Sequence, residues 1–146
     1  CNRGVSGIDG STSTAAGAAC VGEEMTVLIT GDMSFSYDVN GLSSTYLSPR
    51  FKIIVMCNGG GGIFRFIKPT SDLPELETCF EIHRDISVEK YADLFGLRYF
   101  ELNDEKSAAE VLSLFFAEKD RPAILAVHTP NVYNAEVLRG YFRRSR

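Results

Sequence analysis

The sequence predicts an α/β fold, an open and mostly parallel sheet with helices on both faces. Short β-branched apolar runs alternate with segments of helical periodicity, which is the pattern of strand–helix–strand units joined by right-handed crossovers. The apolar runs are nearly continuous, which is typical of strands covered on both faces. The chain has 146 residues, of which 45% are apolar, and this is enough for one domain with a substantial core.

The elements are expected in alternating order. The predicted strands cover residues 25–30, 52–57, 97–102 and 123–128. The predicted helices cover residues 11–20, 88–95, 107–117 and 134–143. Gly96 suits the end of the second helix, and Asp104 suits the start of the third. In the last helix, we expect Ala135, Leu138 and Phe142 to face inward.

Charge and composition exclude several classes of protein. The net charge of −4 argues against a general nucleic-acid binder. No apolar run approaches the ~18 residues of a membrane span. The four cysteines, Cys1, Cys20, Cys57 and Cys79, have no CxxC spacing, which argues against a zinc site or a redox pair. We therefore expect buried free thiols in a reducing compartment, with a cytoplasmic location.

Polar residues follow the first two strands at the points where these strands end. Asp32 and Asn58 lie 26 positions apart, which is the length of one crossover plus one strand. Ligands bind beyond the carboxyl ends of strands in such sheets, and hard oxygen ligands suit Mg²⁺. The glycines at 59–62 would let main-chain groups approach a diphosphate, and the helix after Ser34 would offer N–H groups. On the residues alone, an ordinary strand end followed by a flexible turn remains an equal alternative.

Resemblance to a known family favours the cofactor site. Gly31-Asp32 followed by Asn58 resembles the thiamine-diphosphate motif, although Met33 replaces the usual glycine and Cys57-Asn58 replaces the usual Asn-Asn pair. The segments 2–17, 31–40 and 58–64 resemble, more narrowly, the C-terminal cofactor domain of the 2-succinyl-5-enolpyruvyl-6-hydroxy-3-cyclohexene-1-carboxylate synthases (MenD family). The similarity covers the whole chain and is strongest over residues 2–67. It implies the pyrophosphate-binding domain of the thiamine-diphosphate-binding fold.

The resemblance also implies roles for individual residues. Asp32, Asn58 and the main-chain oxygen of Gly60 would hold Mg²⁺, or Mn²⁺, against the diphosphate. Ile8 would be the apolar wedge beneath thiamine diphosphate, and Arg3 would bind a substrate carboxylate. The other residues implied in cofactor binding are Ser6, Gly31, Met33 and Ser34. The apolar wall beside the substrate would consist of Ile63, Phe64 and Ile67.

The implied activity is decarboxylation of 2-oxoglutarate and addition of the resulting carbanion to isochorismate, in menaquinone biosynthesis. The activating glutamate would come from the pyrimidine-binding domain of a partner subunit. Residues 1–146 would then be one cofactor domain, the C-terminal fragment of a homo-oligomeric transferase, and inactive alone. Two alternatives remain: the cofactor domain of another 2-oxoacid enzyme, such as an acetolactate-synthase-like one, and a non-catalytic α/β module that binds a nucleotide.

Overall fold

The structure is a computed structural model that describes residues 7–81 and 86–144. Its centre is a four-stranded sheet in the order β1-β2-β4-β3, in which every neighbouring pair is parallel. The strands are β1 (Thr26–Gly31), β2 (Phe51–Cys57), β3 (Arg98–Leu102) and β4 (Ala123–His128). The predicted fold class is confirmed, and each strand begins and ends within one residue of its predicted position.

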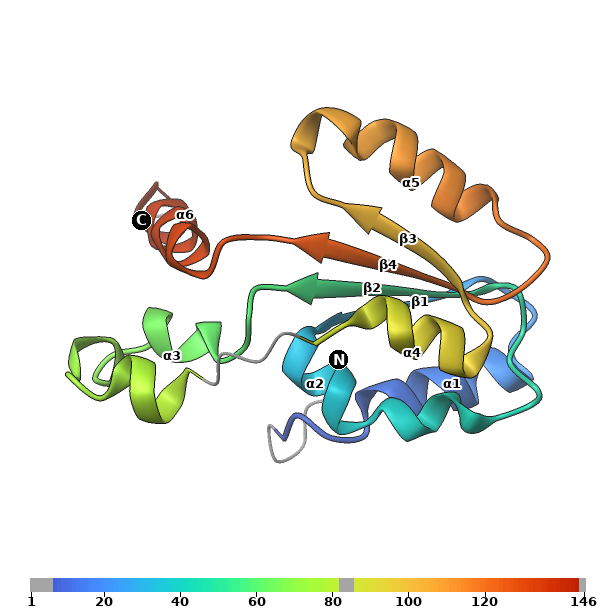
Figure 1. The fold of residues 1–146 in the computed structure, drawn as a ribbon, viewed down its shortest axis with the longest axis horizontal. Coiled ribbons are helices and arrows are strands. Elements are labelled where there is room, and N and C mark those ends of the chain that lie inside the picture. The colour runs from blue at the N-terminus through green and yellow to red at the C-terminus, as the bar shows by residue number, and fades with distance from the viewer. Residues whose placement is uncertain (1–6, 82–85, 145–146) are drawn as a thin grey trace.

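Helices cover both faces of the sheet and its carboxyl edge (Figure 1). The α-helices are α1 (Ser11–Val21), α2 (Asp32–Tyr37), α3 (Gly62–Phe66), α4 (Val88–Phe95), α5 (Ala108–Ala117) and α6 (Asn131–Arg144). Shorter helical turns are η1 (Val39–Ser43), η2 (Thr70–Asp72), η3 (Leu76–Phe80) and η4 (Glu105–Ser107). α1, α2 and α4 lie on one face and α5 on the other (Figure 1).

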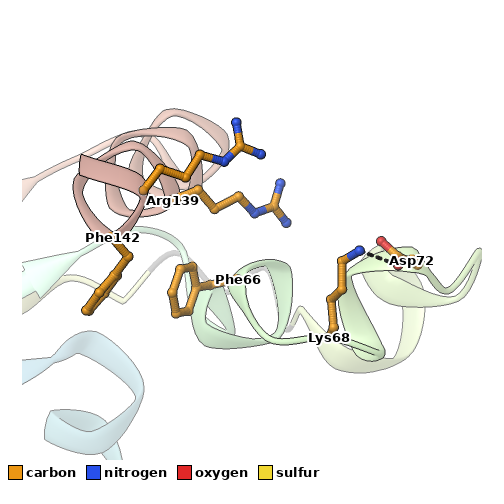
Figure 2. Close-up of a pocket in the computed structure, with 6 residues that line it drawn as sticks. Phe66, Lys68, Asp72, Arg139 and Phe142 are labelled. Carbon is orange, nitrogen blue, oxygen red and sulfur yellow. Dashed lines mark ion pairs between the residues drawn. The ribbon is translucent and has the colours of Figure 1, made fainter. Parts of the chain in front are cut away.

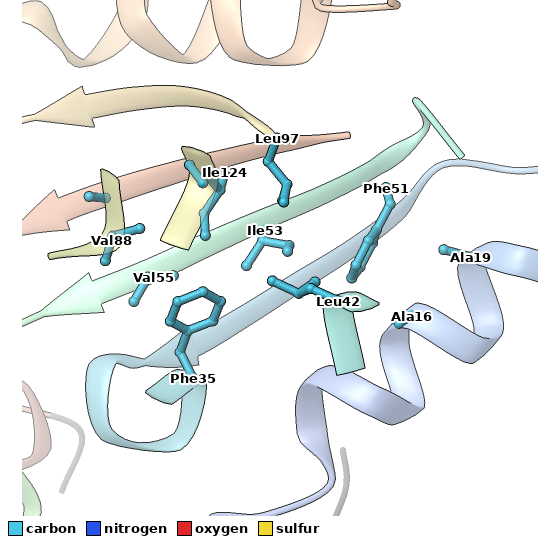
Figure 3. Close-up of a cluster of buried hydrophobic side chains, with 12 residues drawn as sticks. Ala16, Ala19, Phe35, Leu42, Phe51, Ile53, Val55, Val88, Leu97 and Ile124 are labelled. Atoms are coloured by element: carbon cyan, nitrogen blue, oxygen red, sulfur yellow. The ribbon is translucent and has the colours of Figure 1, made fainter. Parts of the chain in front are cut away.

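The larger core lies between the sheet and the helices α1, α2 and α4 (Figure 3). Alternate residues of β2 and β4 point into it, because successive side chains of a strand face opposite sides of a sheet. Its members include the fully buried side chains Phe35, Phe51, Ile53, Val55 and Ile124. This core fixes α2 against β1 and β2, and so it positions the start of α2 at the carboxyl edge.

The second face is covered over only part of the sheet. α5 packs Phe115 against Ala123 and Leu125 of β4, on the side of the sheet opposite the larger core. On the same face of β1, however, the side chains of Val27 and Ile29 are 42% and 69% exposed. The prediction that the apolar strands are covered on both faces is therefore wrong for β1, because α5 packs chiefly on β3 and β4.

α3 and α6 lie beyond the carboxyl ends of the strands, and they pack against each other (Figure 1). The rings of Phe66 and Phe142 are 5.9 Å apart, centroid to centroid. Ala135 is buried as expected, but Leu138 and Phe142 are 41% and 52% exposed. These two side chains are turned toward α3, but they are only partly covered because α6 packs on a short helix rather than on the sheet.

The cysteines also differ from the expectation. Cys20 and Cys79 are exposed, Cys57 is partly buried, and Cys1 lies outside the described residues. The prediction of buried thiols is therefore wrong for two of the three described cysteines. In the part of the chain that the structure describes, no helix combines the length and the apolar character needed to cross a membrane.

Candidate functional site

The carboxylate of Asp32 lies at the carboxyl edge of the sheet, where β1 meets α2. Its side chain is buried, and it accepts backbone N–H bonds from both strand ends. Asp32 Oδ2 accepts from the nitrogens of Asn58, Gly59 and Gly60 at 3.0, 2.9 and 3.1 Å, and Oδ1 accepts from Met33 N at 2.7 Å. Hydrogen bonds to a carboxylate are strong, so this residue joins the two strand ends.

The glycine loop after β2 has the backbone conformation that this arrangement needs. Gly59, Gly60 and Gly61 have φ angles of +85°, +89° and +64°, a region that residues with a Cβ rarely adopt. Successive N–H groups of such a turn point toward one place and form an anion-binding concavity. In this structure they point at Asp32 Oδ2.

Asn58 brings an amide oxygen to the same place. Its Oδ1 accepts from Gly60 N at 3.1 Å, and the same N–H bonds Asp32 Oδ2 at 3.1 Å. The carboxylate and amide oxygens are thus neighbours around one nitrogen. The short separation that the sequence spacing predicted for these two side chains is found.

The space beside the two strand ends bears on whether a ligand could bind there. A Cβ placed on Gly31 or on Gly59 would meet no atom within 4 Å, so space is open beside both strand ends. Asp32 Oδ1 accepts one N–H bond and keeps a free lone pair, and hard oxygen donors are what Mg²⁺ prefers. The residues present fit a magnesium diphosphate. Among the described residues there is no group of three or more His, Cys, Asp and Glu, so any cation here would depend on the single carboxylate of Asp32 together with amide, main-chain and ligand oxygens.

The segment before α1 reaches the site through its backbone. The Ser34 hydroxyl donates to the carbonyl oxygen of Ile8 at 2.7 Å, which ties this segment to the first turn of α2. The Ile8 side chain is 46% exposed. Arg3 and Ser6 lie outside the described residues, and their implied roles stay predictions.

The three apolar residues implied as a substrate wall lie on one short helix or directly after it. Ile63 and Phe64 lie on α3, and Ile67 follows it, with exposed fractions of 61%, 37% and 45%. Ile63 and Ile67 line a cavity of about 670 Å³ between α3 and α6 that also contains Asn58. Phe64 instead packs its ring on Phe80, 5.5 Å between centroids. The structure thus brings two of the three to the cavity beside the candidate metal ligand.

A buried ion pair that the sequence did not indicate holds α3 in place. The fully buried carboxylate of Glu81 accepts from Arg65 Nε at 2.7 Å and from Arg65 Nη2 at 2.5 Å. These bonds and those of Glu77 raise the pKa of Arg65 further above its usual range. Glu81 also accepts from Asn131 Nδ2 at 3.0 Å. Asn131 follows the end of β4. Ligands of parallel sheets bind beyond the carboxyl ends of the strands, so its position could have indicated it, whereas no sequence pattern indicates that residues 65 and 81 pair.

Cys57 is the last residue of β2, directly before Asn58, and its pKa is raised. Burial, followed by the negative charges of Asp32 and Glu101, raises its pKa from 9.0 to about 11. Metal-binding and nucleophilic cysteines need the thiolate form. A raised pKa therefore makes Cys57 poorly suited to either role at neutral pH.

A second cavity, of about 780 Å³, is lined by residues of α3, of α6 and of the segment that follows α3 (Figure 2). Figure 2 shows the rings of Phe66 and Phe142 side by side, with Arg139 above them and Lys68 paired with Asp72. Arg139 donates to the main-chain oxygen of Arg65. These contacts hold α6 against α3, so this cavity is part of the packing around the site.

Fold and site together define an α/β domain whose ligand site is the carboxyl edge of a parallel sheet. Residues 2–127 match the family described as "Thiamine pyrophosphate enzyme, C-terminal TPP binding domain", and the chain belongs to this family.

Individual relatives are more specific than the family. The chain is 49% identical, over 97% of its length, to the 2-succinyl-5-enolpyruvyl-6-hydroxy-3-cyclohexene-1-carboxylate synthase of Porphyromonas gingivalis. It is 45% identical over 98% to the synthase of the same name from Flavobacterium johnsoniae, and 34% over 99% to that of Bacteroides fragilis. The resemblance predicted from the sequence is confirmed. The chain spans 24–26% of the length of these relatives, about a quarter.

Proposed function

We propose that this chain is the C-terminal cofactor domain of a longer thiamine-diphosphate-dependent synthase. Asp32, Asn58 and the main-chain oxygen of Gly60 would hold Mg²⁺, or Mn²⁺, against the cofactor's diphosphate. The observation that carries the proposal is the convergence of Asp32 Oδ2 and Asn58 Oδ1 on Gly60 N, each at 3.1 Å, beside open space at Gly31 and Gly59. When bound, thiamine diphosphate supplies the electron sink for decarboxylation of a 2-oxoacid.

The remaining residues of the site would orient the cofactor. Ser34 and Met33 lie in the first turn of α2, next to Gly31 and the open space beside it. The bond from the Ser34 hydroxyl to the oxygen of Ile8 brings Ile8 to this turn, where its stiff β-branched side chain would act as the wedge under the cofactor. Ser6 would complete the cofactor contacts from the same segment.

The proposed substrates are 2-oxoglutarate and isochorismate, and the proposed pathway is menaquinone biosynthesis. The support is the name shared by relatives up to 49% identical to this chain. Ile63 and Ile67, on the cavity that contains Asn58, would exclude water from the reacting carbons together with Phe64. Arg3 would bind a substrate carboxylate, for which a guanidinium is well suited.

The complete enzyme would need parts that this chain does not contain. We propose a cytoplasmic homo-oligomer in which the pyrimidine-binding domain of a partner subunit supplies the activating glutamate. The support is that the chain spans about a quarter of the length of its relatives, 24% of the Porphyromonas gingivalis synthase. The 146-residue chain alone is expected to turn over nothing.

The test is to express the full-length protein that contains this sequence and to measure both binding and turnover. Thiamine diphosphate with Mg²⁺ should raise the melting temperature, and ATP or NAD should not. The protein should release CO₂ from 2-oxoglutarate and consume isochorismate. Turnover of pyruvate in place of 2-oxoglutarate would favour an acetolactate-synthase-like enzyme. Stabilisation by a nucleotide alone would overturn the whole proposal.

A further inference from the structure

A second side-chain amide reaches the glycine loop from α6. Asn131 is the first residue of this helix, and its Nδ2 donates to Glu81 Oε1 at 3.0 Å. Its other polar atom, Oδ1, is buried and accepts no hydrogen bond within the described part of the chain. An acceptor left without a donor in a protein interior costs about 1–3 kcal/mol. An unmatched atom of this kind beside a binding site indicates a role there.

A hydrogen-bond donor close to Asn131 Oδ1 is the side-chain amide nitrogen of Asn58. A Cβ built on Gly62 would lie 2.5 Å from Asn131 Oδ1 and 2.6 Å from Asn58 Nδ2. An acceptor without a partner and an amide donor thus both lie close to the position that a side chain at residue 62 would occupy. A residue with a Cβ at this position would clash with both amides, and glycine leaves the space between them free.

The orientation of the Asn58 amide matters for its role. Its Oδ1 accepts the Gly60 N–H and faces Asp32, while its Nδ2 faces Gly62 and Asn131. An asparagine binds a cation through its oxygen, because the amide nitrogen has no lone pair to offer. A group that accepts from Nδ2 therefore keeps the oxygen turned toward the cation, as outer partners of metal ligands do.

Asn131 is itself held firmly. The Glu81 carboxylate that accepts from Asn131 Nδ2 is fully buried and also accepts two bonds from the Arg65 guanidinium. A two-point bond of this kind fixes direction as well as distance. Since the Asn131 nitrogen is committed to Glu81, its oxygen is the atom left to face Asn58.

We propose that Asn131 is a positioning residue for the candidate cation site, with its Oδ1 accepting from Asn58 Nδ2 and so presenting Asn58 Oδ1 to the metal. The inference rests on the proposed function, because it deepens the role given there to Asn58. It assigns Glu81 and Arg65 to the support of Asn131. It also explains why glycine stands at position 62.

The test compares two amides of α6 in the full-length protein. Asn131→Ala removes the acceptor that faces Asn58. Asn134→Ala is the matched control, because Asn134 is also an asparagine of α6 but donates to Thr129 Oγ1, at 2.8 Å. The readout is the Mg²⁺ concentration that gives half-maximal binding of thiamine diphosphate to the metal-free protein, measured by calorimetry.

Loss of a residue that hydrogen-bonds a metal ligand lowers the affinity for the metal by about 10–100-fold. We expect Asn131→Ala to raise the half-maximal Mg²⁺ concentration about tenfold or more, and Asn134→Ala to change it less than about twofold. Equal values for Asn131→Ala and the wild type would overturn the inference. An equal loss in both variants would overturn it too, since that would indicate a general packing effect of α6.

Two further variants protect the test against misfolding. Asn131→Ser is too short to reach Glu81 and the Gly62 region together, and it carries the same expectation if Asn131→Ala does not fold by circular dichroism. Gly62→Ala places a methyl between the two amides, so adding Asn131→Ala to it should weaken Mg²⁺ binding no further. Additive losses would contradict the shared contact.

The failure of the proposed function and the failure of this inference give different results. If the wild type itself binds no thiamine diphosphate with Mg²⁺, the proposed function fails. If the wild type binds it and the Asn131 variant binds it equally well, only the inference fails.

Discussion

The two edges of the sheet each contain a buried charge, and the two charges are satisfied in different ways. At the carboxyl edge, Asp32 accepts four backbone N–H bonds that come from both strand ends. At the amino edge, Lys52 is 1% exposed, and its ammonium donates to the main-chain oxygen of Glu118 at 2.7 Å. The same ammonium lies 6.0 Å from the centre of the Phe115 ring.

The difference separates a binding charge from a structural one. Lys52 caps the C-terminal end of α5 and packs its stem on an aromatic ring, which is a complete role for a buried lysine. Burial lowers its pKa, so the charged form is tolerated rather than favoured there. Asp32 instead lies beside open space at Gly31 and Gly59, and within the described part of the chain its Oδ1 accepts one N–H bond and keeps a lone pair for a cation. Burial of a charged side chain alone therefore does not identify a binding site. A binding site also needs open space beside the charge and backbone groups that point toward it.

The largest expected effect is that of Asp32→Asn. The change removes the negative charge next to the proposed cation and weakens charge-assisted bonds worth about 1.5–3 kcal/mol each. We expect the affinity of the full-length protein for thiamine diphosphate in Mg²⁺ to fall on the order of 100-fold, measured by calorimetry. Lys52→Met, at the other edge, should leave this affinity within about twofold. Similar affinities for both variants would remove the distinction between the edges.

The reverse pattern is expected for stability. Lys52→Ala removes the bond to Glu118 and the packing on Phe115, and it should lower the free energy of unfolding by about 2–3 kcal/mol. Lys52→Met keeps the packing and removes a buried charge, so it should recover part of this loss. Urea unfolding followed by far-UV circular dichroism measures both. A Lys52→Ala protein as stable as the wild type would show that the cap contributes nothing.

Two glycines with positive φ give a finer comparison. Gly59 of the loop and Gly96 after α4 have φ angles of +85° and +69°, and a Cβ on either would meet no atom within 4 Å. Alanine at either place should therefore cost the backbone penalty alone, about 1–2 kcal/mol of stability. Only Gly59→Ala should also weaken thiamine diphosphate binding, about tenfold, because Gly59 N bonds Asp32 Oδ2 at 2.9 Å. Equal binding by the two alanine variants would contradict the assigned loop.

The site at the carboxyl edge was predictable because its residues directly follow the predicted strands in the sequence. Gly31-Asp32 and Asn58 each follow an apolar run directly, and the strand-end rule together with the crossover length brings them together. The partners from later in the chain were not predictable in this way. Glu81 lies 16 positions from Arg65 and 50 from Asn131, with no periodic pattern that connects them.

The errors have a similar physical origin. The apolar runs of β1 and of α6 predicted burial, but what covers an apolar face depends on where other elements reach. α5 packs chiefly on β3 and β4, and α6 packs on the short α3, which leaves Ile29 and Phe142 exposed. Lys52 shows the converse case, because nothing in its sequence neighbourhood indicates that a lysine at the start of a strand is fully covered.

The smallest expected effect concerns Cys57 at the end of β2, because the charge of Asp32 contributes to its raised pKa. Its pKa is raised to about 11, first by burial and then by Asp32 and Glu101, so between about pH 9 and 11 the folded protein holds a proton that the unfolded chain releases. The stability that this thiol contributes is thus complete below the unfolded pKa and is lost as the pH rises toward the folded one. We expect the wild type to lose about 1 kcal/mol more than Cys57→Ser between pH 8 and pH 10, by urea unfolding at each pH. Cys79→Ser changes an exposed thiol and should lose as much as the wild type over the same range. If Cys57→Ser and Cys79→Ser show the same pH dependence, the pKa of Cys57 is not raised in the folded protein.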